Sequence, residues 1–148
     1  MKNDYTEYLF RYLYNQGIDP ESIFYINPNG SLHTTVHTGR MIEAFELDIM
    51  FHKKVVTVLT HSFIGVENDN YFRMNVLLNS INSINNQGTF YIDDENRIAF
   101  LYEDSFSKFL SIENPFDWIF YGCERFDMYE ESIMKSLMGS YIFYVNCI

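Results

Sequence analysis

The side chains best suited to chemistry in this chain are four histidines, a short acidic run and two cysteines. His33 and His37 are four residues apart, so on a strand they would face the same way about 13 Å apart, too far for one metal ion. His52 and His61 add no spacing typical of zinc ligands. The sequence therefore predicts isolated histidines and no metal site.

The acidic run Asp93–Asn96 and the thiol of Cys123 also have plain structural interpretations. The run lacks the twelve-residue calcium-loop pattern with its late glutamate, so it favours a turn. Nothing in the sequence orients a histidine toward Cys123, so we expect a free buried thiol. No phosphate-binding glycine loop or nucleophile elbow occurs. These patterns predict neither a catalytic residue nor a cofactor.

Composition and charge exclude several classes of protein. The chain has 148 residues, which we expect to form one domain over 1–148, and its 47% hydrophobic content excludes a disordered chain. The net charge is −10 and the ten basic residues are scattered, which argues against binding nucleic acid or an anionic membrane. The absence of a signal-like start or a long apolar run favours a cytoplasmic protein.

Periodicity and turn residues predict alternating blocks of helices and strands. Apolar residues recur with a helical period in three segments, and β-branched residues separated by turn residues mark the strands. The predicted helices cover about 4–16, 70–86 and 115–139, and the predicted strands cover 23–26, 31–38, 41–49, 55–64, 90–92 and 98–102.

The predicted fold class is α+β, a twisted antiparallel sheet flanked by helices in the order α-β(3–4)-α-β(2–3)-α. Segment 106–112 fits a further edge strand or a loop. Gly122 makes a break in the last helix plausible, and Gly139 is the expected stop.

Four asparagines form a stripe on the second predicted helix. Their spacings of four, three and four residues place Asn75, Asn79, Asn82 and Asn86 on one face. Asparagine is a poor residue for a helix interior, so the stripe needs a cause. The amides could bond the backbone of a neighbouring strand or loop, form a solvated face, or bind a ligand.

Aromatic residues crowd the first and last predicted helices. They include Tyr8, Phe10, Tyr12 and Tyr14 near the start and Trp118 and Tyr121 near the end. Because so many rings cannot all face one core, we predict that these six residues contribute to a protein interface. The alternative is a large aromatic core with tyrosine hydroxyls at its rim.

The residues around the second helix carry a family resemblance. Asn79-x-x-Asn82, the spacing to Gly88, and Phe90-x-x-Asp93 before a hairpin resemble the YbjN family, which is structurally akin to the type III secretion chaperones. The segment from 43 to 66 and the tail from 139 depart from that pattern. The resemblance implies a small, acidic, non-enzymatic protein, often dimeric, that binds partner proteins as extended segments.

We therefore expect a chaperone-like protein-binding module with an unidentified protein partner, and a homodimer is among the expected assemblies. The alternative is an acidic immunity or antitoxin-like protein that masks a basic effector. A pocket that brings histidine and carboxylates together from separate strands would favour an enzyme instead.

Overall fold

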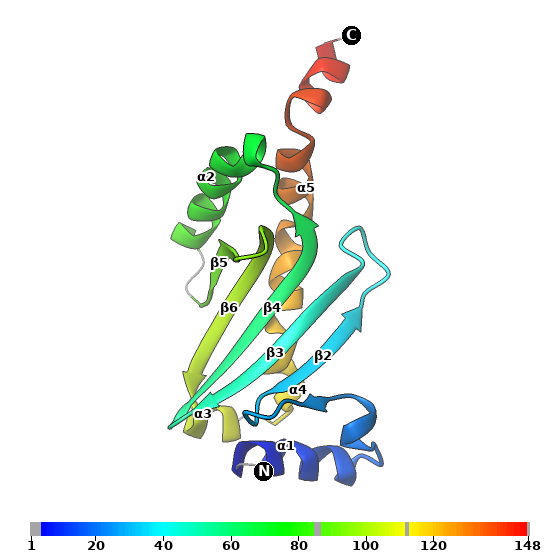
Figure 1. The fold of residues 1–148 in the computed structure, drawn as a ribbon, viewed down its shortest axis with the longest axis vertical. Helices are drawn as coiled ribbons and strands as arrows, with labels where there is room; N and C mark the ends of the chain where they lie inside the picture. Colours follow the sequence, from blue (N-terminus) through cyan, green and yellow to red (C-terminus); the bar gives the residue numbers. More distant parts are fainter. Residues whose placement is uncertain (1–3, 85–86, 112, 148) are drawn as a thin grey trace.

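The computed structural model describes residues 4–84, 87–111 and 113–147, and within those ranges the side chains of 5–138 (Figure 1). The elements in chain order are α1 (Asp4–Asn15), a 3-10 helix η1 (Pro20–Ser22), β1 (Tyr25–Ile26), β2 (Leu32–His37), β3 (Ala44–His52), β4 (Val55–Gly65), α2 (Asn68–Ile84), β5 (Thr89–Ile92), β6 (Arg97–Ser105), α3 (Phe106–Leu110), α4 (Pro115–Ile119) and α5 (Tyr121–Cys147). The predicted α+β class is confirmed.

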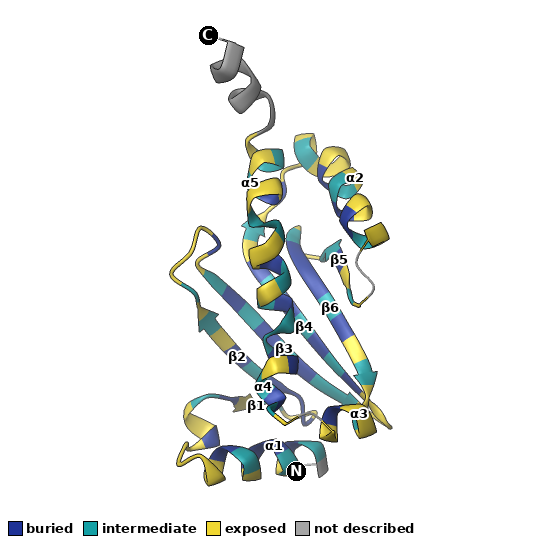
Figure 2. Cartoon of the chain, turned by 180° about the vertical axis from the view of Figure 1, so that it is seen from behind, coloured by how far each residue is buried: buried dark blue, intermediate teal, exposed yellow. Residues whose placement is uncertain are grey.

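The sheet has an antiparallel order β1-β2-β3-β4-β6-β5 and two different faces. Along β3, Phe45, Leu47 and Ile49 are buried, whereas Glu46 and Asp48 between them are half-buried. This alternation follows from the two-residue period of a strand. The apolar face packs against α4 and α5, and no described helix covers the polar face over β2, β3 and β4 (Figures 1 and 2). We call the latter the open face.

Helix α5 lies close against the apolar face because its first turn carries a glycine. A Cβ on Gly122 would stand 2.8 Å from the Cβ of Thr60 on β4, and closer still to the Thr60 hydroxyl oxygen. One turn later, the ring of Phe126 packs on Phe45, with centroids 4.9 Å apart. The predicted break near Gly122 is confirmed, since α4 ends before Phe120 (φ −93°, ψ 8°) and α5 begins after it.

Helix α1 closes one end of the sheet (Figure 1). Its residues Leu9 and Leu13 are fully buried. Gly17 ends the helix at a φ of 77°, which lets the Ile18 N–H donate to the Leu13 carbonyl at 2.9 Å. The hydroxyl of Tyr5 donates to a carbonyl of the β3–β4 turn, which attaches the first turn of α1 to the sheet.

The acidic run between β5 and β6 forms the predicted turn. One carboxylate oxygen of Asp93 accepts the backbone N–H groups of Glu95 and Arg97, each at 2.9 Å. Asn96 adopts a φ of 60°, which asparagine tolerates better than most residues. This turn places the Asp93 side chain at the margin of the open face.

Three predictions of element type or boundary are wrong. The strand predicted over 41–49 begins at Ala44 and runs to His52, because the backbone N–H of Thr38 donates to the Glu43 carbonyl and closes a loop before it. Segment 106–111 is neither strand nor loop, because Ser105 caps a short helix by accepting the Lys108 N–H and Phe109 is buried on that helix; Ile112 lies outside the described residues. Gly139 does not end the last helix, since α5 continues to Cys147. A single glycine costs a helix about 1 kcal/mol and does not by itself stop it.

Candidate functional site

The six aromatic residues predicted at an interface do not lie on one surface. Phe10 and Trp118 are 2% and 3% exposed, so the interface prediction is wrong for both: they belong to the core. Tyr14 is 57% exposed. The other three, Tyr8, Tyr12 and Tyr121, are half-buried.

Ring-to-ring packing explains this aromatic excess. The Trp118 ring packs edge-on against Tyr102 of β6 at 4.9 Å and against Phe109 of α3 at 5.5 Å. Tyr8 of α1 meets the same Phe109 at 5.7 Å. Rings from both ends of the chain therefore join α1, α3, α4 and β6 in one core, because aromatic pairs favour such edge contacts.

The asparagine stripe contains one residue that bridges to a strand. The amide nitrogen of Asn82 donates to the Phe90 carbonyl at 2.9 Å, and its oxygen accepts the Phe90 N–H at 2.8 Å. Backbone bonding, one of the three alternatives for the stripe, is thus observed at this position. Asn79 is exposed and Asn75 is half-buried, while Asn86 lies outside the described residues.

The outer side of α2 carries apolar side chains that the sequence analysis did not single out. Phe72 is 81% exposed and Val76 is 49% exposed, one turn apart on the side opposite the buried residues Met74 and Leu78. Tyr71, at 44%, lies beside them. We call Phe72 and Val76 the α2 stripe. The signal that could have revealed it is the presence of apolar residues half a helical turn away from the core positions.

The open face holds a continuous chain of ionisable side chains from strands β2, β3, β4 and β6 and from the β5–β6 turn. Asp48 on β3 lies between His33 on β2, at 2.8 Å, and His61 on β4, at 3.7 Å. The other ring nitrogen of His61 meets Asp93 at 2.9 Å, and Asp93 in turn meets Arg97 at 3.4 Å. The prediction of isolated histidines is therefore wrong for His33 and His61, because strand pairing brings together residues that are far apart in the chain.

All of these groups except His33 line a shallow basin of about 460 Å³. Its lining includes five carboxylates, from Glu46, Asp48, Asp93, Asp94 and Glu95, against the single guanidinium of Arg97. We call it the open-face basin. Arg97 is already matched to three of these acids, since its guanidinium reaches Glu46 at 3.1 Å and Glu95 at 3.5 Å besides Asp93. The basin is therefore strongly acidic.

The titration of two side chains reflects this arrangement. Burial raises the pKa of Asp93, but hydrogen bonds from the Arg97 N–H, His61 and the Glu95 N–H, together with the Arg97 charge, outweigh it and hold the pKa below its usual value. Burial raises the pKa of Tyr91, and the negative charges of Asp93, Asp94 and Asp48 raise it further. Asp93 is thus held as a carboxylate.

The open-face basin brings histidine and carboxylates together from separate strands. Among the described residues that line it there is no serine, threonine or cysteine. Nδ1 of His61 is hydrogen-bonded to Asp93 at 2.9 Å, whereas Nε2 lies 3.7 Å from Asp48, which is longer than a hydrogen bond. Within the described ranges, no three His, Cys, Asp or Glu side chains are placed to hold a metal ion.

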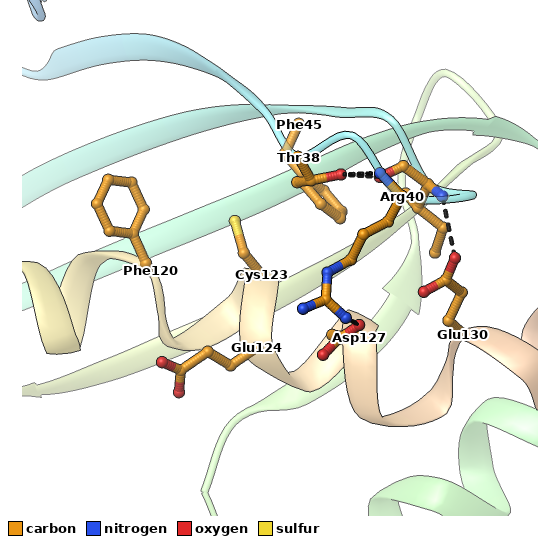
Figure 3. A pocket seen from close by; sticks show the side chains of 9 residues that line it. Thr38, Arg40, Phe45, Phe120, Cys123, Glu124, Asp127 and Glu130 are labelled. Atoms are coloured by element: carbon orange, nitrogen blue, oxygen red, sulfur yellow. Dashed lines mark hydrogen bonds and ion pairs between the residues drawn. The ribbon is translucent and has the colours of Figure 1, made fainter.

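A second pocket lies on the helical side, between the β2–β3 connection and α5 (Figure 3). It contains the sulfur of Cys123, whose pKa rises to about 12, chiefly because burial disfavours the thiolate. A thiol with this pKa is almost wholly protonated at neutral pH and is a poor nucleophile. The partly buried Cys123 is therefore a packing residue here.

Comparison of the chain with protein-family models, with curated proteins and with solved structures gives no match. No helix in the described part of the chain is both long and apolar enough to cross a membrane. The fold and the surfaces described above are therefore the basis for inferring a function.

Proposed function

We propose that this chain is a cytoplasmic protein-binding module. Its resemblance to the YbjN family implies that the module is non-enzymatic, chaperone-like and dimeric. The observation that carries the proposal is the α2 stripe. Phe72, at 81% exposed, leaves nearly its whole ring in water, and Val76 extends that apolar surface by one turn. Exposed apolar side chains one turn apart on a helix favour a protein contact.

The stripe can supply a useful part of a binding free energy. Burying a phenylalanine or valine side chain is worth roughly 1.5–3 kcal/mol each, before the cost of association is subtracted. An apolar segment of a partner laid along α2 would cover Phe72 and Val76 together. The buried residues of α2 stay packed against α5 and β5 in such a complex, so binding requires no unfolding.

The sheet edges are less suitable for binding a partner than this helix face. On β5, the backbone groups of Phe90 that would pair with an added strand are already bonded to Asn82. At the other edge, β1 has only two residues, Tyr25 and Ile26. Addition of a partner's strand to β5 or to β1 is thus disfavoured.

Affinity capture from native lysate, with bound proteins quantified by mass spectrometry, tests the proposal. The wild type is compared with Phe72→Ser and with a matched control, Tyr25→Ser. Tyr25 is a suitable control because its aromatic ring is also exposed, at 64%, but it lies on the opposite edge of the sheet from β5. We expect the wild type and the control to capture one dominant protein. Phe72→Ser should reduce the captured amount of that protein about tenfold or more. Equal capture by all three, or no captured protein, would overturn the proposal.

A second candidate function, an acidic immunity or antitoxin-like protein, is favoured by the open-face basin. Its five carboxylates could mask a basic site on an effector, steered by long-range attraction. The salt concentration distinguishes the two functions. Raising it from about 50 mM to about 500 mM would weaken a charge-driven complex steeply and leave a complex on the α2 stripe largely intact. Asp94 is an exposed residue of the open-face basin, so Asp94→Asn would weaken only the charge-driven complex.

A further inference from the structure

The helix-side pocket encloses about 170 Å³ and has an apolar floor. Ile42 and Phe45, both buried, form that floor together with Phe120 and Cys123. Figure 3 shows the side chains of Phe45, Phe120 and Cys123. A cavity of about 150 Å³ lined by apolar side chains is large enough to hold benzene. The pocket therefore has room for one aromatic ring or one branched alkyl group.

The mouth of the pocket is acidic. Three carboxylates, Glu124, Asp127 and Glu130, come from successive turns of α5, and the only cation among the residues that line the pocket is Arg40. Arg40 is already ion-paired with Asp127. Figure 3 shows Asp127 and Glu130 facing the β2–β3 connection, whereas Glu124 turns away from the other side chains.

Glu130 is the carboxylate with unused capacity. Its Oε1 accepts the backbone N–H of Ile42 at 3.3 Å, which is a neutral partner, and among the described residues no cation pairs with it. A carboxylate has about four acceptor positions, so most of those on Glu130 remain available to a ligand. A cation at this position would gain a charge-assisted hydrogen bond beside an apolar floor.

We propose that this pocket binds a small amine, with its apolar group on the floor formed by Ile42 and Phe45 and its ammonium group hydrogen-bonded to Glu130. Volume limits the apolar group to about one ring, and the acidic mouth selects a positive over a negative charge. The amine could be a free small molecule or the N-terminal residue of a protein. This inference is independent of the α2 stripe and does not depend on the function proposed above.

Titration followed by amide NMR tests the proposal, because the Ile42 N–H donates to Glu130 and reports on it directly. Phenethylamine is compared with hydrocinnamate, which has a similar apolar body and the opposite charge. We expect phenethylamine to shift the Ile42 amide saturably and hydrocinnamate to leave it unchanged. The absence of saturation, or equal shifts from both compounds, would overturn the proposal.

Two variants distinguish binding in the pocket from attraction to the overall negative charge of the protein. Glu130→Gln keeps an oxygen that can accept the Ile42 N–H but loses the charge, so we expect the affinity for phenethylamine to fall about tenfold. Glu131→Gln removes an equal charge from the next residue, which is exposed and pairs with Lys135, and should leave the affinity unchanged. Equal losses in both variants would mean non-specific attraction and would contradict the proposal.

The two sources of the amine are distinguished with peptides. A tripeptide that begins with phenylalanine is compared with its N-acetylated form. Tighter binding of the free tripeptide than of phenethylamine supports a protein N-terminus as the ligand, and tighter binding of phenethylamine supports a free small molecule. Binding of the acetylated peptide as tight as that of the free peptide would contradict a role for the ammonium group.

Discussion

The side-chain amide of Asn82 on α2 forms hydrogen bonds with both backbone polar groups of Phe90 on the edge strand β5. Asparagine suits this position because one side chain supplies the donor and the acceptor that a neighbouring strand would otherwise provide. The contact fixes α2 against the sheet. It also satisfies the backbone groups through which an edge strand pairs with other chains.

Replacing Asn82 by alanine should lower the free energy of unfolding by about 1–3 kcal/mol, since it leaves two backbone groups of Phe90 without partners. Self-association should also rise, because the edge becomes available. Chemical denaturation and light scattering measure the two effects. Asn79→Ala, three residues earlier in the stripe and exposed, is the control and should change little. If both variants behave alike, the bridging role of Asn82 is wrong.

Gly122→Ala should destabilise the protein by roughly 1–3 kcal/mol, because the added methyl group overlaps Thr60 and forces α5 away from β4. Thermal unfolding measures the loss. Gly65→Ala is the matched control: its added methyl group meets nothing within 4 Å, so stability should be nearly unchanged. A Gly122→Ala protein as stable as the control would show that α5 does not depend on this close approach.

Asp93→Asn should lower stability near neutral pH by about 1–3 kcal/mol, because the amide keeps the turn hydrogen bonds but loses the charge that faces His61 and Arg97. The folded state holds the pKa of Asp93 below its usual value of about 3.9. Its contribution is therefore complete above that value and is lost as the pH falls through the folded-state pKa.

The difference in stability between wild type and Asp93→Asn should accordingly shrink as the pH is lowered from about 5 to about 2. Urea denaturation at several pH values measures it. A difference that stays constant over this range would show that the carboxylate charge of Asp93 does not stabilise the fold.

Trp118→Ala should cost roughly 3–5 kcal/mol, since the ring is buried between Tyr102 and Phe109. Tyr14→Ala removes a ring that is 57% exposed and should cost less than about 1 kcal/mol. The two free energies of unfolding, measured side by side, test whether the aromatic residues of the terminal helices divide into core and surface as described. Similar costs would contradict that division.

Local patterns were sufficient to predict most of the fold. The helical period, the acidic run that forms a turn at Asp93–Asn96, and the helix start at 115 are encoded in short windows of sequence, and each forms the expected element or boundary. Helix α3 was missed because its cap, Ser105, follows a strand without a break. The burial of its Phe109 against α1 and α4 is a long-range contact that no short window contains.

The candidate sites could not be predicted in the same way. The open-face basin depends on pairing that sets Asp48 beside His33 and His61, residues separated from it by more than ten positions. The helix-side pocket depends on a loop before β3 meeting α5 almost ninety residues later, at Ile42 and Glu130. Sequence supplies the residue types of such sites, and the sheet register and helix packing decide which of them meet.

The most direct measurement of the central claim is photocrosslinking at position 72 in the native cell. A photoreactive phenylalanine replaces Phe72 in one sample and Tyr25, similarly exposed on β1, in another. If the α2 stripe binds a protein, illumination should yield a discrete crosslinked species from position 72 and little from position 25. Uncrosslinked monomer alone from position 72, or the same products from both positions, would contradict the account.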